Sequence, residues 1–354
     1  MKVSAPIPYS QQNDSRRHTP FTQVSSQAMT DNHSAFYWPV MLMTTFLASL
    51  ITLSSAMADY PVTVQDDRSK SITFEKQPQS VASISVFGAD LMWALDQQAT
   101  GLSTLNHRQS AYLGDQVSRM KDLGEVHETD MERLTELNPD LIIGLRQYTE
   151  PFASKFEEIG QFLAFDLVTQ EDSEQAIMTV TRALDQAQQG QALNQNFQAL
   201  KEEFKQKAPG EVSAILIWHW ADTLYAFYNH YLSTDIMQSL KVENAMGRSP
   251  TPALKKPDSS VLSMERLLRL NPDVILSFTG DEAPISYHPV WQRLKAVQNK
   301  RVYRINDQYV MPHGPVAREM VLREMAHLFY PDQFPAPDNI PDAARAKPLT
   351  FSER

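Results

Sequence analysis

One thirteen-residue segment occurs twice in this sequence, and it constrains the fold more than any other feature. Residues 131–143 read MERLTELNPDLII and residues 264–276 read MERLLRLNPDVIL, so nine of thirteen positions are identical at an offset of 133. In each copy a capping residue, Asp130 or Ser263, precedes apolar residues at three-residue spacing, which predicts a short helix. Proline disfavours helical backbone in the residue before it, and the β-branched run after it predicts a buried strand. Each copy is therefore half of an α/β unit with parallel strands.

Apolar runs elsewhere in the chain complete one lobe around each copy. Buried strands are predicted at 81–86 and 213–218, a helix at 89–95, and a closing strand at 301–305 before a last helix at 316–329. Strands that alternate with helices in this way are typical of parallel sheets. We therefore predict two similar α/β lobes with parallel-strand sheets, at residues 59–170 and 211–335.

Two further segments lie outside these lobes. The connecting segment, residues 171–210, is polar and carries one apolar stripe formed by Leu193, Phe197, Leu200 and Phe204. Gly190 is expected to divide it, and an unbroken helix from 191 to 207 would be about 25 Å long, enough to join the lobes as a single long connecting helix. The last segment, residues 336–354, is rich in proline and predicts an extended, peripheral tail.

The first 58 residues resemble an export signal. No charged side chain occurs from residue 34 to residue 58, and the run ends in Ala56-Met57-Ala58, a pattern that a signal peptidase accepts. We therefore expect cleavage after Ala58, with a retained membrane anchor as the alternative. Met29 is an alternative start. Because the chain of 354 residues has no cysteine, it offers no site for a lipid-modified N-terminal cysteine, and we expect a periplasmic protein that is not a lipoprotein.

Composition excludes several classes of function. A net charge of −10 without any cluster of basic residues argues against nucleic acid binding. The 11 glycines form neither a GxGxxG nor a GxxxxGK[ST] loop, which argues against nucleotide enzymes. Histidines are scattered singly, so we expect no direct protein ligands to a metal ion. No GxSxG is present, and Asp281 and Asp307 lack an identifiable partner, so an exported hydrolase remains only a distant alternative and no catalytic residue is predicted.

Candidate ligand-binding residues follow from the position of the strands, because open α/β sheets bind ligands at the carboxyl ends of their strands. This rule selects Phe87, Arg146, Tyr148, Trp218, His219, Trp220, Tyr309 and His313, with Arg108 and Tyr112 as weaker candidates. Aromatic rings can enclose a flat or apolar chelate, and a guanidinium can pair with its anionic oxygens. Alternation along a strand leaves open which of Trp218, His219 and Trp220 face the cleft.

The order of these motifs resembles the periplasmic binding proteins that supply ABC importers with ferric siderophores, haem or cobalamin. The resemblance covers residues 60–335. It includes the hairpin around Asp66-Asp67-Arg68-Ser69, the ADLMWAL segment at 89–95, Leu123-Gly124, both repeat copies and the PVWQRL segment at 289–294. One departure is Ser80, where the family often has arginine.

This resemblance implies a carrier rather than an enzyme. Such a protein would be a monomer without a cofactor of its own, would bind a ferric siderophore between its lobes, and would deliver it to an inner-membrane ABC permease with its ATPase. Haem and cobalamin are alternatives within the class, and Tyr148, His219, Tyr309 and His313 are available as axial ligands to haem. A scaffold protein without any small ligand is a third interpretation.

The resemblance also assigns a role to one glutamate in each repeat copy. Glu132 and Glu265 stand at equivalent positions near the start of the predicted helices. In the resembling family, glutamates there dock onto arginines of the permease. The alternative explanation is that the helix dipole stabilises the two carboxylates.

Overall fold

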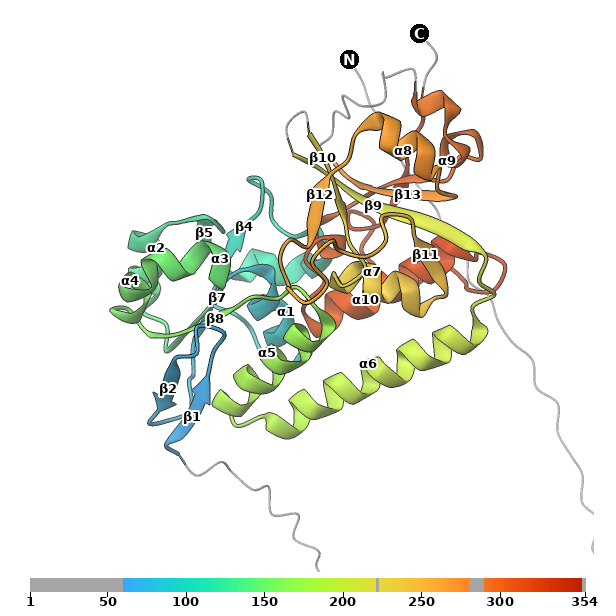
Figure 1. The fold of residues 1–354 in the computed structure, drawn as a ribbon. Coiled ribbons are helices and arrows are strands. Elements are labelled where there is room, and N and C mark those ends of the chain that lie inside the picture. Colours follow the sequence, from blue (N-terminus) through green and yellow to red (C-terminus); the bar gives the residue numbers. More distant parts are fainter. Residues whose placement is uncertain (1–59, 221–222, 280–289, 352–354) are drawn as a thin grey trace, which may run out of the picture. The chain divides into compact units, whose positions relative to one another are not determined.

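The structure is a computed structural model that describes residues 60–220, 223–279 and 290–351 (Figure 1). The predicted export signal and Asp281 lie outside the described residues. Within the described ranges, no helix is both long enough and apolar enough to cross a bilayer.

The N-terminal lobe begins with the predicted hairpin, which the structure confirms. Strands β1 (Val62–Gln65) and β2 (Ser71–Phe74) pair antiparallel. A six-stranded sheet comes next, in the order β6-β5-β4-β3-β7-β8, parallel except for its edge strand β6. Its strands are β3 (Val81–Ile84), β4 (Gly101–Thr104), β5 (Lys121–Glu125), β6 (Glu128–Thr129), β7 (Leu141–Leu145) and β8 (Gln161–Phe165). The helices of this lobe are α1 (Val86–Ala94), α2 (Met131–Leu137), α3 (Arg146–Thr149) and α4 (Ala153–Glu157), with a 3₁₀ segment at Ala111–Arg119.

The C-terminal lobe has a seven-stranded sheet of mixed direction. Its order is β12-β10-β9-β13-β14-β15, and β11 also pairs with β9. The strands are β9 (Val212–Trp220), β10 (Thr223–Phe227), β11 (Val242–Asn244), β12 (Ser259–Val261), β13 (Val274–Phe278), β14 (Val302–Ile305) and β15 (Lys347–Pro348). The helices are α7 (Leu232–Ser239), α8 (Met264–Leu270), α9 (Lys295–Gln298) and α10 (Pro315–Phe329). Strands β9, β13 and β14 are parallel, as predicted, whereas β10, β12 and β15 pair antiparallel at the two sides.

The two copies of the repeat fold alike, as predicted. Asp130 and Ser263 each accept a hydrogen bond from the backbone N–H three residues later, which caps α2 and α8. Both helices end at an asparagine in the left-handed conformation, Asn138 and Asn271. The strands after these turns are central in their sheets, because β7 pairs with β3 and β8, and β13 pairs with β9 and β14.

The connecting segment differs from its prediction in one detail. It forms a helical hairpin of α5 (Gln170–Ala183) and α6 (Ala187–Lys207), so the break falls before Gly190. The chain turns at Asp185, which has a φ of 58°. Gly190 lies inside α6, where a Cβ would stand only 2.1 Å from the Thr181 hydroxyl oxygen, so it permits close helix packing instead of ending a helix.

The last helix provides a second connection between the lobes. The N-terminus of α10 reaches α1, where the buried Asp90 carboxylate accepts hydrogen bonds from the backbone N–H groups of Val316 and Ala317, both at 2.8 Å. Tyr112, a weaker site candidate, is buried and donates its hydroxyl to the same carboxylate. Arg318 of α10 is also buried, with its guanidinium 4.5 Å from the centre of the Phe197 ring on α6.

The prediction of a peripheral tail is wrong. Residues 336–351, here named the C-terminal strap, contact both lobes. Ile340 and Ala344 are 3% and 0% exposed within the hydrophobic core of the N-terminal lobe, and β15 adds an edge strand to the C-terminal sheet. The strap is also extended only in part, because the backbone oxygen of Pro341 accepts hydrogen bonds from the N–H groups of Ala344 and Arg345 and closes a turn there.

Candidate ligand-binding site

Two neighbouring cavities lie between the lobes and share Leu105 and Asn106 in their walls. The first, of about 490 Å³, is here named the aromatic compartment, because its walls include Tyr148, Trp218, Tyr225, Phe227 and Tyr231. The second, of about 800 Å³, is named the cationic compartment, because its walls include Arg108, Arg304, Arg345 and Lys347. Both lobes contribute to both compartments, so they form one interlobe cleft.

The rings of the aromatic compartment come mainly from β9, β10 and the segment after β10. Trp218 lies nearly parallel to Phe227, with ring centres 6.5 Å apart, and Phe227 stacks on Tyr231 at 4.3 Å. From the N-terminal lobe, Tyr148 on α3 and His127 complete the wall, with ring centres 6.4 Å apart. These apolar ring faces can pack against a flat or aromatic ligand.

His313 is the unusual polar group of the aromatic compartment. It lines the cavity, is 4% exposed, and packs edge-to-face against Tyr231 at 6.1 Å. Among the described residues its Nε2 atom has no hydrogen-bond partner. Burial lowers the pKa of His313 to about 3, so the ring is neutral at pH 7. A neutral imidazole nitrogen at a cavity wall can accept a hydrogen bond or ligate a metal ion.

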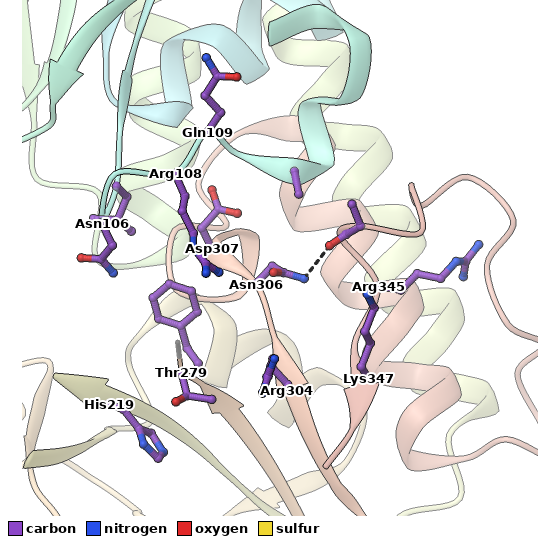
Figure 2. A pocket seen from close by; sticks show the side chains of 14 residues that line it. Asn106, Arg108, Gln109, His219, Thr279, Arg304, Asn306, Asp307, Arg345 and Lys347 are labelled. Atoms are coloured by element: carbon purple, nitrogen blue, oxygen red, sulfur yellow. Dashed lines mark hydrogen bonds between the residues drawn. The ribbon is translucent and has the colours of Figure 1, made fainter. Parts of the chain in front are cut away.

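Among the described residues, four side chains in the walls of the cationic compartment are cations. Figure 2 shows Arg108 descending from the N-terminal lobe, and Arg304 and Lys347 rising side by side from the C-terminal sheet. Among the described residues that line this cavity, Asp307 is the one carboxylate, and it accepts a hydrogen bond from the Ser110 hydroxyl across the cleft. Cationic side chains such as these can form hydrogen bonds with an anionic ligand.

Strand β9 contributes to both compartments because its side chains alternate. Trp218 lines the aromatic compartment, and His219, the next residue, lines the cationic one. The Nε2 atom of His219 lies 2.9 Å from the Ser277 hydroxyl oxygen, and burial lowers the pKa of His219 to about 4. Trp220 ends β9, and its side chain lies outside the described residues.

Three predicted ligand contacts are wrong in this structure. Phe87 is 3% exposed and packs edge-to-face on Phe165, because β3 ends at Ile84 and α1 has begun by residue 87. Tyr309 is fully buried, and its hydroxyl donates to the Glu324 carboxylate at 2.8 Å.

The third wrong contact is Arg146, which lines neither compartment. Its Nε atom lies 2.9 Å from Asp166 Oδ1, and the guanidinium also donates to the backbone oxygen of Asp67 at 2.8 Å. Arg146 therefore holds the end of β7 to the β1–β2 hairpin. Its position directly after a core strand is as predicted, but the neighbouring carboxylate determines its direction.

Glu132 and Glu265, which the sequence resemblance assigned to docking, are exposed. They lie in the first turns of α2 and α8, one helix on each lobe (Figure 1). Within the part of the chain that the structure describes, no group of three or more histidine or acidic side chains could hold a metal ion.

Sequence reasoning missed several wall residues. Arg304 obeys the same rule that selected the other candidates, since it lies near the carboxyl end of β14. Arg345 and Lys347 had no such signal, because the prediction placed their segment at the periphery. Arg108, a weaker candidate, does line the cleft.

Comparison with known proteins agrees with this architecture. The periplasmic binding protein family matches residues 81–309. Two curated relatives come from Bacillus subtilis. The putative ABC transporter substrate-binding lipoprotein YhfQ is 22% identical, over 75% of this chain and 90% of its own length. The uncharacterized ABC transporter substrate-binding lipoprotein YvrC is 20% identical, over 78% of this chain and 87% of its own length. The crystal structure of the triscatecholate siderophore-binding protein FeuA from Bacillus subtilis with ferri-bacillibactin superposes with a TM-score of 0.62, at 17% identity, over 75% of this chain and 97% of FeuA.

These relatives correct one prediction. The expectation that the protein is not a lipoprotein is contradicted, since both curated relatives are named as lipoproteins. The lack of cysteine in this sequence bears on one chemistry of lipid attachment only, and it does not determine whether a protein works at a membrane. A binding role outside the cytoplasm is consistent with both relatives.

The family model spans well over half of the chain, from β3 of the N-terminal lobe through the connecting helices to the residues just after β14 of the C-terminal lobe. Proteins of this kind bind small ligands, work with a membrane permease and an ATPase, and do not form an enzyme family. The chain therefore belongs to the periplasmic binding protein family and is a substrate-binding protein of an ABC transporter.

Proposed function

We propose that the protein binds a ferric siderophore in the interlobe cleft and delivers it to an ABC permease. The observation that carries this proposal is the adjacency of an aromatic and a cationic compartment in one cleft. A siderophore presents both kinds of surface, since rings or chains surround a metal whose ligand oxygens are anionic.

The absence of a metal-ligand cluster among the described residues is compatible with such a cargo. The chelator already saturates the iron, so the protein needs to contact only the outside of the complex. Trp218 and Tyr148 from opposite lobes can enclose the ligand, and Arg108 and Arg304 can pair with its oxygens. FeuA, whose structure holds ferri-bacillibactin, supports the proposal by its shared fold.

The cleft is braced on several sides, which favours a preformed site. Ser173 donates its hydroxyl to the backbone oxygen of His313 at 2.6 Å, and Lys255 forms an ion pair with Asp172. Together with the contact of Asp90 to α10, these bonds restrict relative movement of the lobes. We expect ligand binding to change the lobe angle only slightly, and closure by tens of degrees would contradict this architecture.

Delivery requires a surface that the permease can recognise. We propose that the exposed Glu132 and Glu265, one on each lobe, form that surface. They lie on helices that the repeat places equivalently, so a permease with two similar halves could contact both.

Haem is the second candidate, and one observation favours it. The buried, neutral His313 presents a nitrogen without a partner among the described residues, at the wall of an aromatic cavity. Such a nitrogen could serve as an axial ligand to haem iron. Tyr309, which the sequence also offered for this role, is committed to Glu324 and is not available.

Titration of tryptophan fluorescence tests the two candidates. The protein is titrated with ferric siderophores of several chemical types, with haem and with cobalamin. We expect saturable quenching by a ferric siderophore, weakened at least tenfold in Trp218→Ala and unchanged in the control Trp93→Phe. Haem binding with a Soret shift that His313→Gln abolishes would establish the second candidate instead. Flat titrations with every ligand would contradict both.

A further inference from the structure

A tight hairpin, residues 105–108, stands between the two compartments and is here named the cleft hairpin. It follows β4 of the N-terminal lobe, and the backbones of Leu105 and Arg108 pair through hydrogen bonds of 3.2 and 3.1 Å. Leu105 and Asn106 line both compartments, and Figure 2 shows Asn106 and Arg108 among the side chains around the cationic one. A ligand that extends from one compartment into the other therefore passes this hairpin, so the position of the hairpin affects how the ligand fits.

The sequence of the cleft hairpin only partly favours its backbone conformation. Asn106 and His107 have φ angles of 54° and 58°, so both central residues are left-handed, as a type I′ turn requires. Asparagine tolerates this conformation, whereas the second central position is usually glycine. A histidine there is strained, and its conformation persists only if neighbouring groups hold it.

Glu125, at the end of the neighbouring strand β5, holds both the base and the tip of this hairpin. Its Oε1 atom accepts hydrogen bonds from the Thr104 hydroxyl and from the backbone N–H of His107, both at 2.6 Å. The same oxygen lies 3.2 Å from Nδ1 of His107. Glu125 is 7% exposed, and hydrogen bonds to a carboxylate in such a place are strong. The strained residue is therefore fixed by one side chain outside the hairpin.

The carboxylate of Glu125 serves the cleft more than the sheet. Its other neighbour is His127, whose Nδ1 lies 4.0 Å from Oε2 and whose ring lines the aromatic compartment. Among the described residues this Oε2 atom has no hydrogen-bond partner. The pairing of β5 with β4 and β6 uses backbone groups and does not need the carboxylate. Loss of the carboxylate should thus release the hairpin and leave the sheet intact.

We infer that Glu125 is a positioning residue of the binding site, which holds the cleft hairpin where Asn106 contacts the ligand. This inference rests on the proposed function. Glu125 lines neither compartment, so it acts through the hairpin and not by touching the ligand. Asn106 is exposed and lines both compartments, and its amide can donate to and accept from polar groups of the ligand.

Rescue of a released hairpin tests this inference. The full chain is titrated by tryptophan fluorescence with a ferric tris-catecholate, a ferric tris-hydroxamate and haem. Glu125→Ala should weaken binding of each ligand that the unaltered protein binds by about tenfold, because the hairpin is no longer preorganised. Glu125→Gln keeps an acceptor oxygen and should stay within about threefold. Adding His107→Gly to Glu125→Ala should restore affinity to within about threefold, because Asn-Gly forms a type I′ turn without outside support.

Two further variants control for effects on the fold. Glu128→Ala removes an exposed carboxylate from the neighbouring strand β6 and should leave affinity unchanged. Asn106→Gly keeps the left-handed backbone and the bonds to Glu125, so it should fold normally and still weaken binding by about threefold or more, through loss of the amide.

Backbone hydrogen exchange without ligand provides a second measurement. The Arg108 amide, which donates to Leu105, should exchange faster in Glu125→Ala and return to its original rate when His107→Gly is added. Unchanged affinity in Glu125→Ala or in Asn106→Gly would overturn the inference and leave the proposed function standing, as would a loss of affinity that persists after exchange is restored. Failure of the unaltered protein to bind any of the three ligands would overturn the proposed function and the inference with it.

Discussion

The two lobes share one scaffold and differ in the segments that extend from its strands. In the N-terminal lobe the Asp140 carboxylate accepts hydrogen bonds from the backbone N–H and the hydroxyl of Ser80, and in the C-terminal lobe Asp273 makes the same two bonds with Ser213. Both pairs are 60 residues apart, and the strands they join have the same register. The duplication therefore extends well beyond the thirteen residues visible in the sequence.

The lobes diverge at the carboxyl ends of their equivalent strands. Strand β3 ends at Ile84 and α1 begins almost at once, whereas β9 continues to Trp220 and returns as β10. At the offset of 133, Ser85 and Val86 correspond to Trp218 and His219. Ser85 and Val86 are buried at the start of a helix, and Trp218 and His219 line the cleft. The shared part of the two lobes forms the common scaffold, and the part that differs lines the interlobe cleft.

The largest expected effect tests this division between fold and site. Phe87→Ala should lower the free energy of unfolding by about 3–5 kcal/mol, because it empties a buried aromatic position, and should leave ligand affinity unchanged in the folded fraction. Trp218→Ala should do the opposite, with a smaller loss of stability and a large loss of affinity. Urea unfolding measures the first quantity, with the exposed Phe152→Ala as control. A loss of ligand affinity in Phe87→Ala would show that Phe87 contributes to the binding site after all.

A second prediction concerns acid stability in the C-terminal lobe. His313 has its pKa lowered to about 3 by burial, with Asp172 and Asp258 opposing and Lys256 adding to the effect. A folded pKa below the unfolded value of 6.5 means that its contribution to stability is present at neutral pH and lost as the pH falls below 6.5. The loss should reach roughly 3 kcal/mol at about pH 4. His313→Gln should flatten this part of the stability curve, measured by urea unfolding, and an unchanged curve would show that protonation of this ring does not limit acid stability.

The N-terminal lobe should show the opposite dependence on pH. Burial raises the pKa of Asp90 to about 6, although the N–H groups of α10 and the Tyr112 hydroxyl lower it in part. A carboxyl whose folded pKa is raised stabilises the protein at low pH, and that contribution is lost as the pH rises from about 4 to about 6. In Asp90→Asn, the decrease in the free energy of unfolding between about pH 4 and neutral pH should be smaller by roughly 2–3 kcal/mol, as measured by urea unfolding at several pH values. If Asp90→Asn lost stability more steeply than the unaltered protein as the pH rises, the pH dependence would not come from Asp90.

The fourth prediction tests the equivalence of the lobes directly. Asp140→Ala and Asp273→Ala should each cost about 2 kcal/mol, because each removes charge-assisted hydrogen bonds that join two neighbouring strands. The exposed Asp115→Ala is the matched control and should cost almost nothing. A large cost in one lobe alone would show that the duplicated bonds no longer contribute equally.

Sequence predicted the shared part of the lobes better than the site, for physical reasons. Capping, proline and β-branched runs act locally, so the helices and strands of both repeat copies could be placed. Side-chain direction depends on contacts distant in sequence: Arg146 turns toward Asp166 and Tyr309 toward Glu324. Lys347 reaches the cleft only because Gln308 and Glu324 hold the strap. No local pattern records such contacts.

The smallest effect on the isolated protein is expected from the two glutamates that we propose to contact the permease. Glu132 and Glu265 are exposed in the first turns of equivalent helices, so replacing both with alanine should change stability by at most about 0.5 kcal/mol per site, through the lost interaction with the helix dipole. Ligand affinity should not change, because neither residue lines the cleft. Uptake of the chelate by cells should nevertheless fall strongly, and each single variant should retain part of it if the lobes dock independently. Normal growth of the double variant on the chelate as sole iron source would show that the two glutamates only stabilise their helices and do not contact the permease.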